Sequence, residues 1–178
     1  GISQILPGLT LARMLKEKHP HLHITLGGPI FSVNSKQLLD QPEFFDEFCD
    51  SVVTFEGEEP LHRLLTALKQ GTALKEVPNL LFCDNGKVEL NEERVELRFE
   101  ELPPPTFDGL PMDLYLSPYP ILPVLQSRGC YWGKCTFCTH SFVYGHRYGK
   151  QRTQQMVGEL EALAEKYNTK YFTFSDEA

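Results

Sequence analysis

Several features that would assign a protein to a special environment are absent from this 178-residue sequence. No apolar run approaches the ~20 residues of a membrane-spanning helix, so a membrane is not expected as a partner. Basic residues are fewer than acidic ones, 17 against 24, and a net charge of −7 does not favour general binding to nucleic acid. No secretory signal is visible, and clustered free thiols favour a reducing compartment. We therefore expect a cytoplasmic protein with neither a membrane nor a nucleic acid as its partner.

Acidic residues are also absent from one internal stretch. Between Leu114 and Gly158 there is no Asp or Glu, although the stretch contains five basic residues. These are Arg128, Lys134, Arg147, Lys150 and Arg152. One interpretation is that these cations stabilise nearby thiolates and a reduced metal cluster. An equally good interpretation is that they form a solvated basic surface.

The same stretch contains three of the five cysteines. Cys130, Cys135 and Cys138 follow the spacing C-x4-C-x2-C. Gly133 lies inside the first gap, where glycine permits the positive φ values that a tight wrap requires. Iron–sulfur clusters that are saturated by protein use four cysteines. Three thiolates from one loop therefore indicate a cluster with one iron open to a substrate or cofactor.

A structural zinc site is the alternative interpretation of this loop. His140 follows the third cysteine, and the four side chains together supply a Cys3His tetrahedron. Zinc sites usually join two separated ligand pairs, whereas this set lies in one local loop, so the spacing favours the cluster. The remaining cysteines, Cys49 and Cys83, lie in apolar segments and are predicted to be core residues.

At these residues the sequence resembles the radical S-adenosylmethionine enzymes. Their signature is usually C-x3-C-x2-C with an aromatic residue just before the last cysteine; Phe137 holds that position, and the first gap here is longer. The string is similar to a variant in the cobalamin-domain branch, and to radical enzymes that mature peptides. The resemblance implies that the three cysteines bind a 4Fe–4S cluster whose open iron chelates S-adenosylmethionine. Tyr131, Trp132 and Phe137 become candidates to pack on adenine or shield a radical, with loop packing as the alternative.

Residues 1–75 alternate helical and strand patterns. We predict a helix near 8–18, strands at 24–26 and 51–55, and then a leucine-rich helix. This alternation is typical of an α/β fold with a parallel sheet covered by helices. Ligands of such sheets bind beyond the carboxyl ends of the strands.

Two glycine-containing turns follow these predicted strands, Gly27-Gly28 and Glu56-Gly57. The order of the elements resembles the C-terminal half of a cobalamin-binding domain, which is a truncated doubly wound, Rossmann-type domain. The resemblance implies that Gly27, Gly28, Glu56 and Gly57 contribute to a cofactor site. Nothing in the sequence carries a loop with a cobalt-ligating histidine, so ligation of cobalt is not predicted.

Residues 76–121 are interpreted as a hairpin connector and a proline-rich linker, with Asn85-Gly86 typical of a type I′ turn. Residues 122–178 contain a strand, a long loop, a helix and a strand, which is one βαβ unit. By resemblance this unit is the start of a partial (β/α), TIM-like barrel. Active sites of barrels lie at the carboxyl ends of the strands. Asp176 and Glu177, after the second strand, are therefore candidates to bind the amino group of S-adenosylmethionine.

The resemblance implies a radical enzyme that cleaves S-adenosylmethionine reductively into a 5′-deoxyadenosyl radical. We expect a cobalamin-dependent methyltransferase or a peptide-modifying enzyme, with a small molecule or peptide as substrate and flavodoxin or ferredoxin as reducing partner. The alternatives are a non-enzymatic zinc-stapled module and a cobalamin-sensing regulatory domain. The sequence opens inside a helical pattern and stops just after a strand. We therefore expect a piece of a longer enzyme that is inactive alone.

Overall fold

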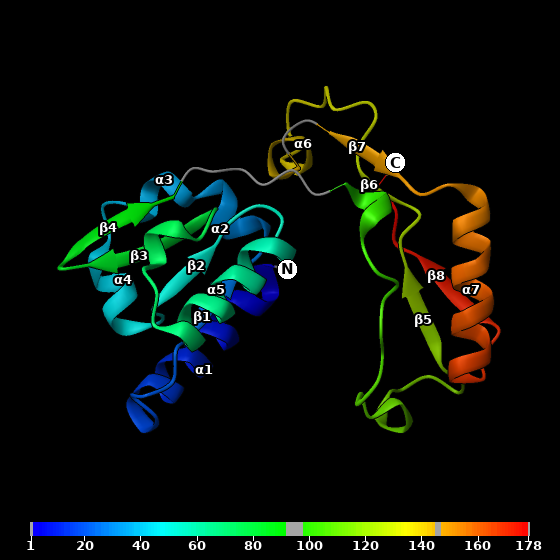
Figure 1. Ribbon diagram of the computed structural model, residues 1–178, viewed down its shortest axis with the longest axis horizontal. Coiled ribbons are helices and arrows are strands. Elements are labelled where there is room, and N and C mark those ends of the chain that lie inside the picture. The colour runs from blue at the N-terminus through cyan, green and yellow to red at the C-terminus, as the bar shows by residue number, and fades with distance from the viewer. Residues whose placement is uncertain (1, 92–97, 145–146, 178) are drawn as a thin grey trace. The chain divides into compact units, whose positions relative to one another are not determined.

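The chain has a mixed α/β fold that divides into two compact units, Gly1–Glu96 and Leu97–Ala178 (Figure 1). The structure is a computed structural model, and it describes residues 2–91, 98–144 and 147–177. Each unit has its own sheet and its own apolar core.

A four-stranded sheet forms the centre of the first unit. Its strands β1 (Thr25–Gly27) and β2 (Ser51–Val53) are parallel, while β3 (Leu80–Asp84) and β4 (Lys87–Leu90) continue it antiparallel in the order β1-β2-β3-β4. The turn between β3 and β4 has positive φ at Asn85 (51°) and Gly86 (78°), as the predicted type I′ turn requires.

The hairpin β3–β4 differs from the expectation of a connector, because it pairs with β2 and completes this sheet. Leu81 packs into the core on one face, and its neighbours Leu80 and Phe82 pack into the core on the other. Because β3 is a continuous apolar run, both of its faces must be buried. It therefore pairs inside a sheet that is covered on both sides.

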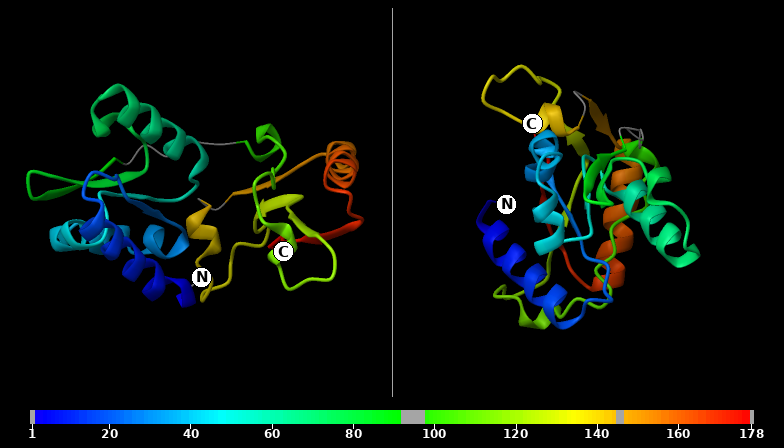
Figure 2. Two further views of the ribbon diagram at one scale, coloured as in Figure 1. Left: turned by 90° about the horizontal axis from the view of Figure 1, so that it is seen from below. Right: turned by 90° about the vertical axis from the view of Figure 1, so that its left-hand side faces the viewer.

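Helices cover both faces of the sheet (Figure 2). One side carries α1 (Ile5–Lys18), α2 (Pro29–Val33), α3 (Ser35–Leu38) and α4 (Pro42–Glu47), and the opposite side carries α5 (Glu58–Gln70). Because successive strand residues point to opposite faces, Val52 packs with Phe45 under α4, while Val53 packs with Leu64 of α5. Short 3₁₀ turns lie at Ile2–Gln4 (η1) and Leu74–Glu76 (η2).

Two helix boundaries follow from proline and glycine. Helix α1 begins at Ile5, before the predicted boundary, because Pro7 lies in its first turn, where the missing N–H has no helical partner to lose. Helix α5 ends at Gly71, whose left-handed conformation (φ 69°) closes the helix as predicted.

The second unit contains one βαβ arrangement. Strands β5 (Ile121–Val124) and β8 (Tyr171–Phe174) are parallel, and α7 (Thr153–Tyr167) lies between them in the chain. Met156 and Leu163 of α7 pack on Leu122 and Val124. The alternate residues of β5, Ile121 and Pro123, are exposed on the face that α7 does not cover.

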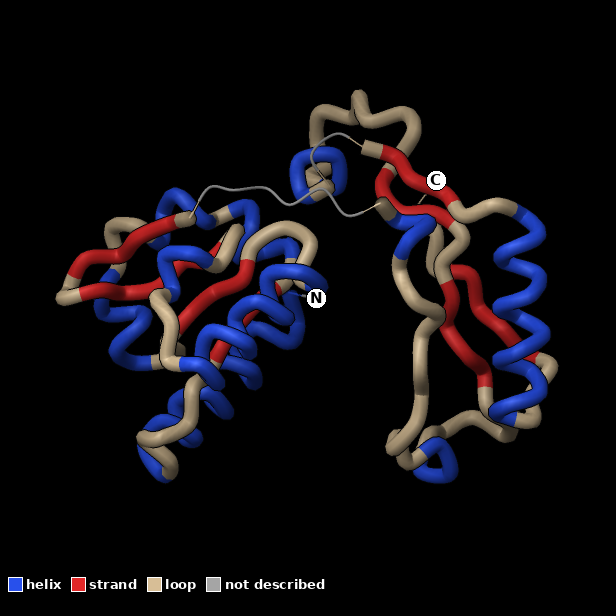
Figure 3. The backbone as a smooth tube through the Cα atoms, in the orientation of Figure 1, coloured by secondary structure: helices blue, strands red, loops and turns tan. Residues whose placement is uncertain are grey.

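A separate two-stranded ribbon stands after β5. It pairs β6 (Ser127–Gly129) antiparallel with β7 (Tyr148–Lys150), and α6 (His140–Val143) lies between these strands in the chain. Figure 3 shows the run from β6 to α6 as a loop without regular structure. The 3₁₀ turns of this unit are η3 (Phe99–Glu101) and η4 (Met112–Leu114).

The segment before β5 is fastened to the end of α7. Tyr167 donates its hydroxyl hydrogen to Asp108 (2.8 Å) and accepts a hydrogen bond from the amide of Phe107 (2.7 Å), and Lys166 contacts Asp108 at 2.6 Å. These hydrogen bonds from Lys166 and Tyr167 hold the pKa of Asp108 below its ordinary value.

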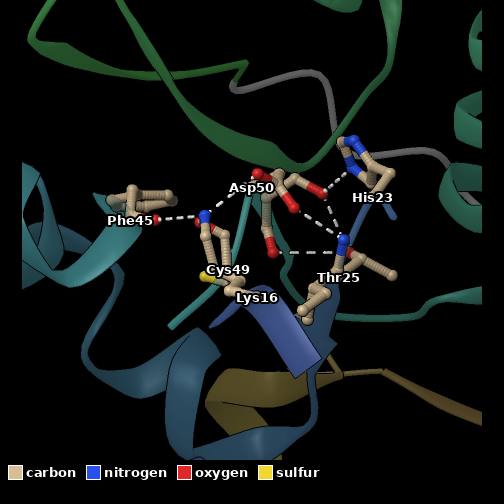
Figure 4. Close-up of polar contacts among 8 residues, drawn as sticks. Lys16, His23, Thr25, Phe45, Cys49 and Asp50 are labelled. Atoms are coloured by element: carbon tan, nitrogen blue, oxygen red, sulfur yellow. Dashed lines mark hydrogen bonds and ion pairs between the residues drawn. The ribbon is translucent and has the colours of Figure 1, made fainter. Parts of the chain in front are cut away.

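A polar cluster joins α1, α4 and the amino ends of β1 and β2 (Figure 4). The ammonium of Lys16 donates to the carbonyl oxygens of Phe45 (2.9 Å) and Cys49 (3.3 Å) and to Asp50 Oδ1 (3.0 Å). The other carboxylate oxygen of Asp50 accepts a hydrogen bond from the amide of Ile24 at 2.7 Å. The cluster lies at the amino edge of the parallel strands, opposite their carboxyl ends, so we assign it a structural role.

His23, Ser51 and Asp50 lie close together in this cluster but do not form a nucleophilic triad. Ser51 is fully buried and donates its hydroxyl hydrogen to Thr25 (3.0 Å), so His23 Nε2 must supply the hydrogen of its 2.9 Å contact with Ser51. A catalytic histidine would instead accept the serine hydrogen.

We expect the first unit to lose stability as the pH falls below about 6.5, because of His23. Burial lowers the pKa of His23 from 6.5, with a further contribution from Lys16, and the carboxylate of Asp50 opposes the shift. The unfolded chain therefore binds this proton more strongly than the folded one, and protonation favours unfolding between pH 6.5 and the lowered pKa. Urea unfolding followed by circular dichroism should give a steeper loss between about pH 7 and pH 5 for the wild type than for His23→Gln. Parallel curves for the two proteins would contradict this assignment.

Candidate functional site

The cysteine loop is held at its base by the β6–β7 ribbon. Ser127 pairs with Lys150, and Gly129 pairs with Tyr148, so the two ends of the cysteine-containing segment are brought together. Gly129 has φ 82°, and a Cβ atom there would lie 2.1 Å from the carbonyl oxygen of Arg147. Only glycine permits this close approach of the two backbones.

Inside the loop, the predicted positive φ of Gly133 is confirmed at 58°. A Cβ atom on this glycine would lie 3.2 Å from the hydroxyl oxygen of Ser141, so the loop folds back onto α6. The amide of Cys138 donates to the carbonyl of Cys135 (3.2 Å), which makes a turn between these two cysteines. The backbone therefore bends at both gaps of the cysteine spacing.

The three thiols differ in exposure: Cys135 is exposed, and Cys130 and Cys138 are half-buried. Within residues 2–91, 98–144 and 147–177, no three His, Cys, Asp or Glu side chains lie close enough together to hold a metal ion. Three accessible thiols on one bent loop fit a cluster chemically, because thiolate is the usual ligand of iron–sulfur clusters. Binding would require the side chains to converge, so the ligand role of these cysteines stays a prediction.

The aromatic side chains of the loop face solvent. Tyr131, Trp132 and Phe137 are 70%, 58% and 89% exposed. Tyr131 makes an edge contact with Tyr148, with ring centroids 6.0 Å apart, and the ammonium of Lys134 lies 5.3 Å from the Trp132 ring centre. Phe137 is the most exposed of the three, and covering a bound group would bury its apolar ring, which is favourable.

The carboxylates predicted to bind S-adenosylmethionine make contacts within the chain. Asp176 accepts hydrogen bonds from the amides of Gln126 (3.2 Å) and Ser127 (2.5 Å), and from the Ser127 hydroxyl (2.5 Å). Glu177 Oε1 lies 2.8 Å from His140 Nδ1. Sequence reasoning found both acids but missed Ser127, and it considered His140 only as a metal ligand.

The predicted turns of the first unit lie side by side, because β1 and β2 are parallel. Gly28 has φ 107° at the start of α2, and a Cβ on Gly27 would lie 3.4 Å from the Val53 carbonyl oxygen. Glu56 and Gly57 follow β2 and lead into α5. The structure therefore brings these four residues to one edge of the sheet, and their role in binding a cofactor stays a prediction.

Sequence reasoning missed the pair that joins these two turns. Phe55 has φ 60°, which is rare for an aromatic residue, and its amide donates to the hydroxyl of Ser32 at 2.7 Å. Ser32 is fully buried and comes from α2, so it couples the turn after β1 to the turn after β2. A lone serine in a short helix gives no signal of such a contact in sequence.

The other cysteines lie in the core of the first unit. Cys49 is fully buried, and burial raises the pKa of its thiol to about 12. Cys83 is half-buried and packs against the same core cluster. A thiol with such a high pKa is not ionised at neutral pH, so Cys49 is a poor ligand and nucleophile.

An apolar cavity of about 150 Å³ lies elsewhere in the second unit. It is lined by the proline-rich segment and by β5, including Met112, Tyr119 and Ile121. It therefore lies toward the beginning of β5, whereas the cysteine loop follows the carboxyl end of that strand. In the described part of the chain, no helix has the length and apolar character needed to cross a membrane.

Comparison with known proteins places this geometry in context. No family profile matches the chain. It is 32% identical over 173 residues to the uncharacterized methyltransferase PH0819 of Pyrococcus horikoshii, an alignment that covers 94% of this chain and 36% of that protein. The chain thus spans about a third of the length of this curated relative.

Two solved structures share the fold. The cobalamin-dependent S-adenosylmethionine radical enzyme OxsB, with aqua-cobalamin bound, matches with a TM-score of 0.71 at 23% identity, over 98% of this chain and 24% of that one. The radical S-adenosylmethionine methyltransferase TsrM of Kitasatospora setae, with cobalamin and a 4Fe–4S cluster bound, matches with a TM-score of 0.59 at 21% identity, over 94% of this chain and 34% of that one. The fold is therefore shared with radical S-adenosylmethionine enzymes that have cobalamin bound, in agreement with the resemblance predicted from the cysteine loop.

Proposed function

We propose that this chain is part of a cobalamin-dependent radical S-adenosylmethionine enzyme and that Cys130, Cys135 and Cys138 hold its 4Fe–4S cluster. The observation that carries the proposal is the position of the three thiols on one bent loop. Its base is closed by β6–β7, next to the carboxyl end of a parallel βαβ unit. The cluster bound in TsrM supports the choice of cofactor.

The two units correspond, in this proposal, to two parts of such an enzyme. Residues 1–75 form the C-terminal half of a cobalamin-binding, doubly wound domain, and residues 122–178 begin a partial (β/α) barrel. The parallel β1–β2 pair between two helical layers supports the first assignment, and the parallel β5–β8 pair under α7 supports the second. Residues 76–121 connect them, although their hairpin β3–β4 is paired into the first sheet.

When bound, the cluster supplies the electron that cleaves S-adenosylmethionine into methionine and a 5′-deoxyadenosyl radical. The chain's own residues position this chemistry and exclude water from it. Phe137 and Tyr131 have exposed rings that can cover the adenine of the cofactor. Glu177 retains a carboxylate oxygen, Oε2, that has no hydrogen-bond partner among the described residues, and we propose that it accepts a hydrogen bond from the cofactor's amino group. Asp176 was predicted to bind the same group, but both of its carboxylate oxygens already accept hydrogen bonds from the chain.

The first unit supplies a cobalamin site in this proposal. Its candidate contacts are the strand-end turns, Gly27-Gly28 and Glu56-Gly57, which Ser32 holds together through Phe55. The cobalamin bound in OxsB and TsrM supports this assignment.

The methyltransferase relatives favour methyl transfer to a small molecule or peptide, with flavodoxin or ferredoxin as the electron donor. The basic residues around the loop suit an acidic donor of this kind.

One contact favours a zinc site as the second candidate. The bond between His140 Nδ1 and Glu177 is the arrangement that orients the other ring nitrogen of a zinc-ligating histidine. In that case, the three cysteines and His140 form a Cys3His site, and the chain is a binding module without redox chemistry.

Anaerobic reconstitution distinguishes the two candidates. With ferrous iron and sulfide, we expect a brown protein with about four irons per chain and, after reduction, a paramagnetic signal that changes when S-adenosylmethionine is added. Added hydroxocobalamin that stays with the protein through gel filtration would support the cobalamin site. A colourless protein that takes up one zinc and excludes iron would reject the cluster.

A further inference from the structure

We propose that Asp176 and Glu177 are positioning residues that hold the two flanks of the three cysteines at the carboxyl end of β8. The flanks are Ser127, before Cys130, and His140, after Cys138. Asp176 fixes the backbone where β6 begins, and Glu177 fixes His140 where α6 begins. The inference rests on the proposed function only for its consequence for the cluster, since the contacts themselves belong to this chain.

The contacts at the beginning of the loop continue the pairing of β5 with β8. The amide of Ser175 donates to the carbonyl of Val124 (3.0 Å), so the ladder extends past the end of both strands. The next residue, Asp176, then receives three hydrogen bonds, two from backbone amides and one from the Ser127 hydroxyl. Ser127 is buried, and bonds to an ionised carboxylate are stronger than bonds between neutral groups. The carboxylate thereby fixes the direction in which the chain leaves β5.

The contact at the end of the loop uses the adjacent residue. Glu177 Oε1 lies 2.8 Å from His140 Nδ1, and the His140 ring stacks on Tyr144 with centroids 6.3 Å apart. His140 is the first residue of α6 and comes two positions after Cys138. Consecutive side chains at the end of one strand therefore hold both flanks of the three cysteines.

The loop needs this support because its own secondary structure is small. The β6–β7 ribbon has three residue pairs, and an isolated two-stranded ribbon is at best marginally stable. Bringing three thiols to one centre also requires ordering of the loop, and a loop with fixed ends loses less conformational entropy on binding. Asp176 suits this role better than a direct contact with the cofactor, because both of its oxygens already accept bonds from the chain.

Hydrogen exchange on the metal-free chain tests the positioning role. The amides that report on it belong to Arg128 and Gly149, which face each other at the centre of the ribbon, since Asp176 contacts neither of them directly. We expect Asp176→Ala to speed their exchange by about tenfold or more. Asp176→Asn, which keeps one carbonyl acceptor, should retain part of the protection from exchange. Ser127→Ala should also reduce this protection, but by less than Asp176→Ala.

Asp108→Asn is the matched control for general destabilisation. Asp108 is another carboxylate of the same unit, and it binds the end of α7 through Lys166 and Tyr167. This variant should leave the exchange of the β6–β7 amides and the iron content of the reconstituted chain unchanged. Asp176→Ala should lower the iron content by half or more, and the clusters that do form should bind S-adenosylmethionine as in the wild type.

Two results would overturn the positioning role. One is unchanged exchange of the ribbon amides in Asp176→Ala, together with weaker binding of S-adenosylmethionine, which would make Asp176 a direct ligand. The other is equal acceleration in Asp108→Asn, which would make the effect a general loss of stability. If the wild type retains no iron, the proposed cluster is wrong, and the exchange comparison still decides whether Asp176 holds the loop.

Discussion

Alanine in place of Cys135 is expected to abolish iron retention after anaerobic reconstitution, and the same holds for Cys130 and Cys138. A cluster held by three protein thiolates has no spare ligand, so the loss of one leaves two irons without protein ligation. Iron and sulfide per chain, measured after gel filtration, give the readout. The expected change is from about four irons to fewer than one.

The controls are the two cysteines in the first unit. Cys83→Ala removes a half-buried thiol and should leave the iron content at the wild-type value. Cys49→Ala removes a fully buried one and should lower stability by about 1 kcal/mol without loss of iron. Normal iron in Cys135→Ala, or loss of iron in Cys83→Ala, would show that the ligand assignment is wrong.

Thiol alkylation of the metal-free chain provides an independent check of the same assignment. Because burial raises the pKa of Cys49 to about 12, this thiol should stay unmodified while the chain is folded. The exposed Cys135 should react first. A bound cluster should then protect the three loop thiols together from alkylation. Because a bound zinc ion would protect them too, the iron content must be measured in the same samples.

The bent cysteine loop and the β3–β4 turn were predictable because each depends on residues that are close together in the sequence. Three thiols and Gly133 within one short stretch indicate a wrapped loop, and Asn85-Gly86 indicates a type I′ turn, whatever the rest of the chain does. The strands of the βαβ unit and the helix between them were predictable for a similar reason, since their apolar periodicity is continuous.

The ribbon that supports the loop was not predictable from its own residues. Its strands, Ser127–Gly129 and Tyr148–Lys150, are too short and too polar to show an alternating pattern. They pair because of contacts between residues far apart in the sequence: the close approach of Gly129 to Arg147, and the hydrogen bonds that Ser127 donates to Asp176. The hairpin β3–β4 gives the same lesson, because its turn can be predicted locally but its pairing with β2 depends on burial of both faces.

The largest effect on stability is expected from Gly129→Ala. The new methyl group would lie 2.1 Å from the carbonyl oxygen of Arg147, a backbone atom that cannot rotate away, and φ is 82°. Left-handed strain costs about 1–2 kcal/mol, and overpacking adds roughly 1–3 kcal/mol. The sum is a large share of the ~5–15 kcal/mol that stabilises a typical domain, so the ribbon should open.

Two glycines of the same unit are matched controls for this substitution. Gly158 lies within α7 with nothing within 4 Å of its added Cβ, so Gly158→Ala should stabilise the unit by about 1 kcal/mol. Gly133→Ala has the left-handed strain (φ 58°), but its nearest neighbour is the movable side chain of Ser141 at 3.2 Å. The stability of Gly133→Ala should therefore lie between those of Gly129→Ala and Gly158→Ala.

Urea unfolding, followed by the fluorescence of Trp132, the single tryptophan, reports on the loop itself. The expected midpoints increase in the order Gly129→Ala, Gly133→Ala, wild type, Gly158→Ala. Gly129→Ala should also lose iron although every cysteine remains, because the two ends of the loop would no longer be held together. A Gly129→Ala protein with the wild-type midpoint and full iron content would mean that the ribbon does not set the geometry of the cysteine loop.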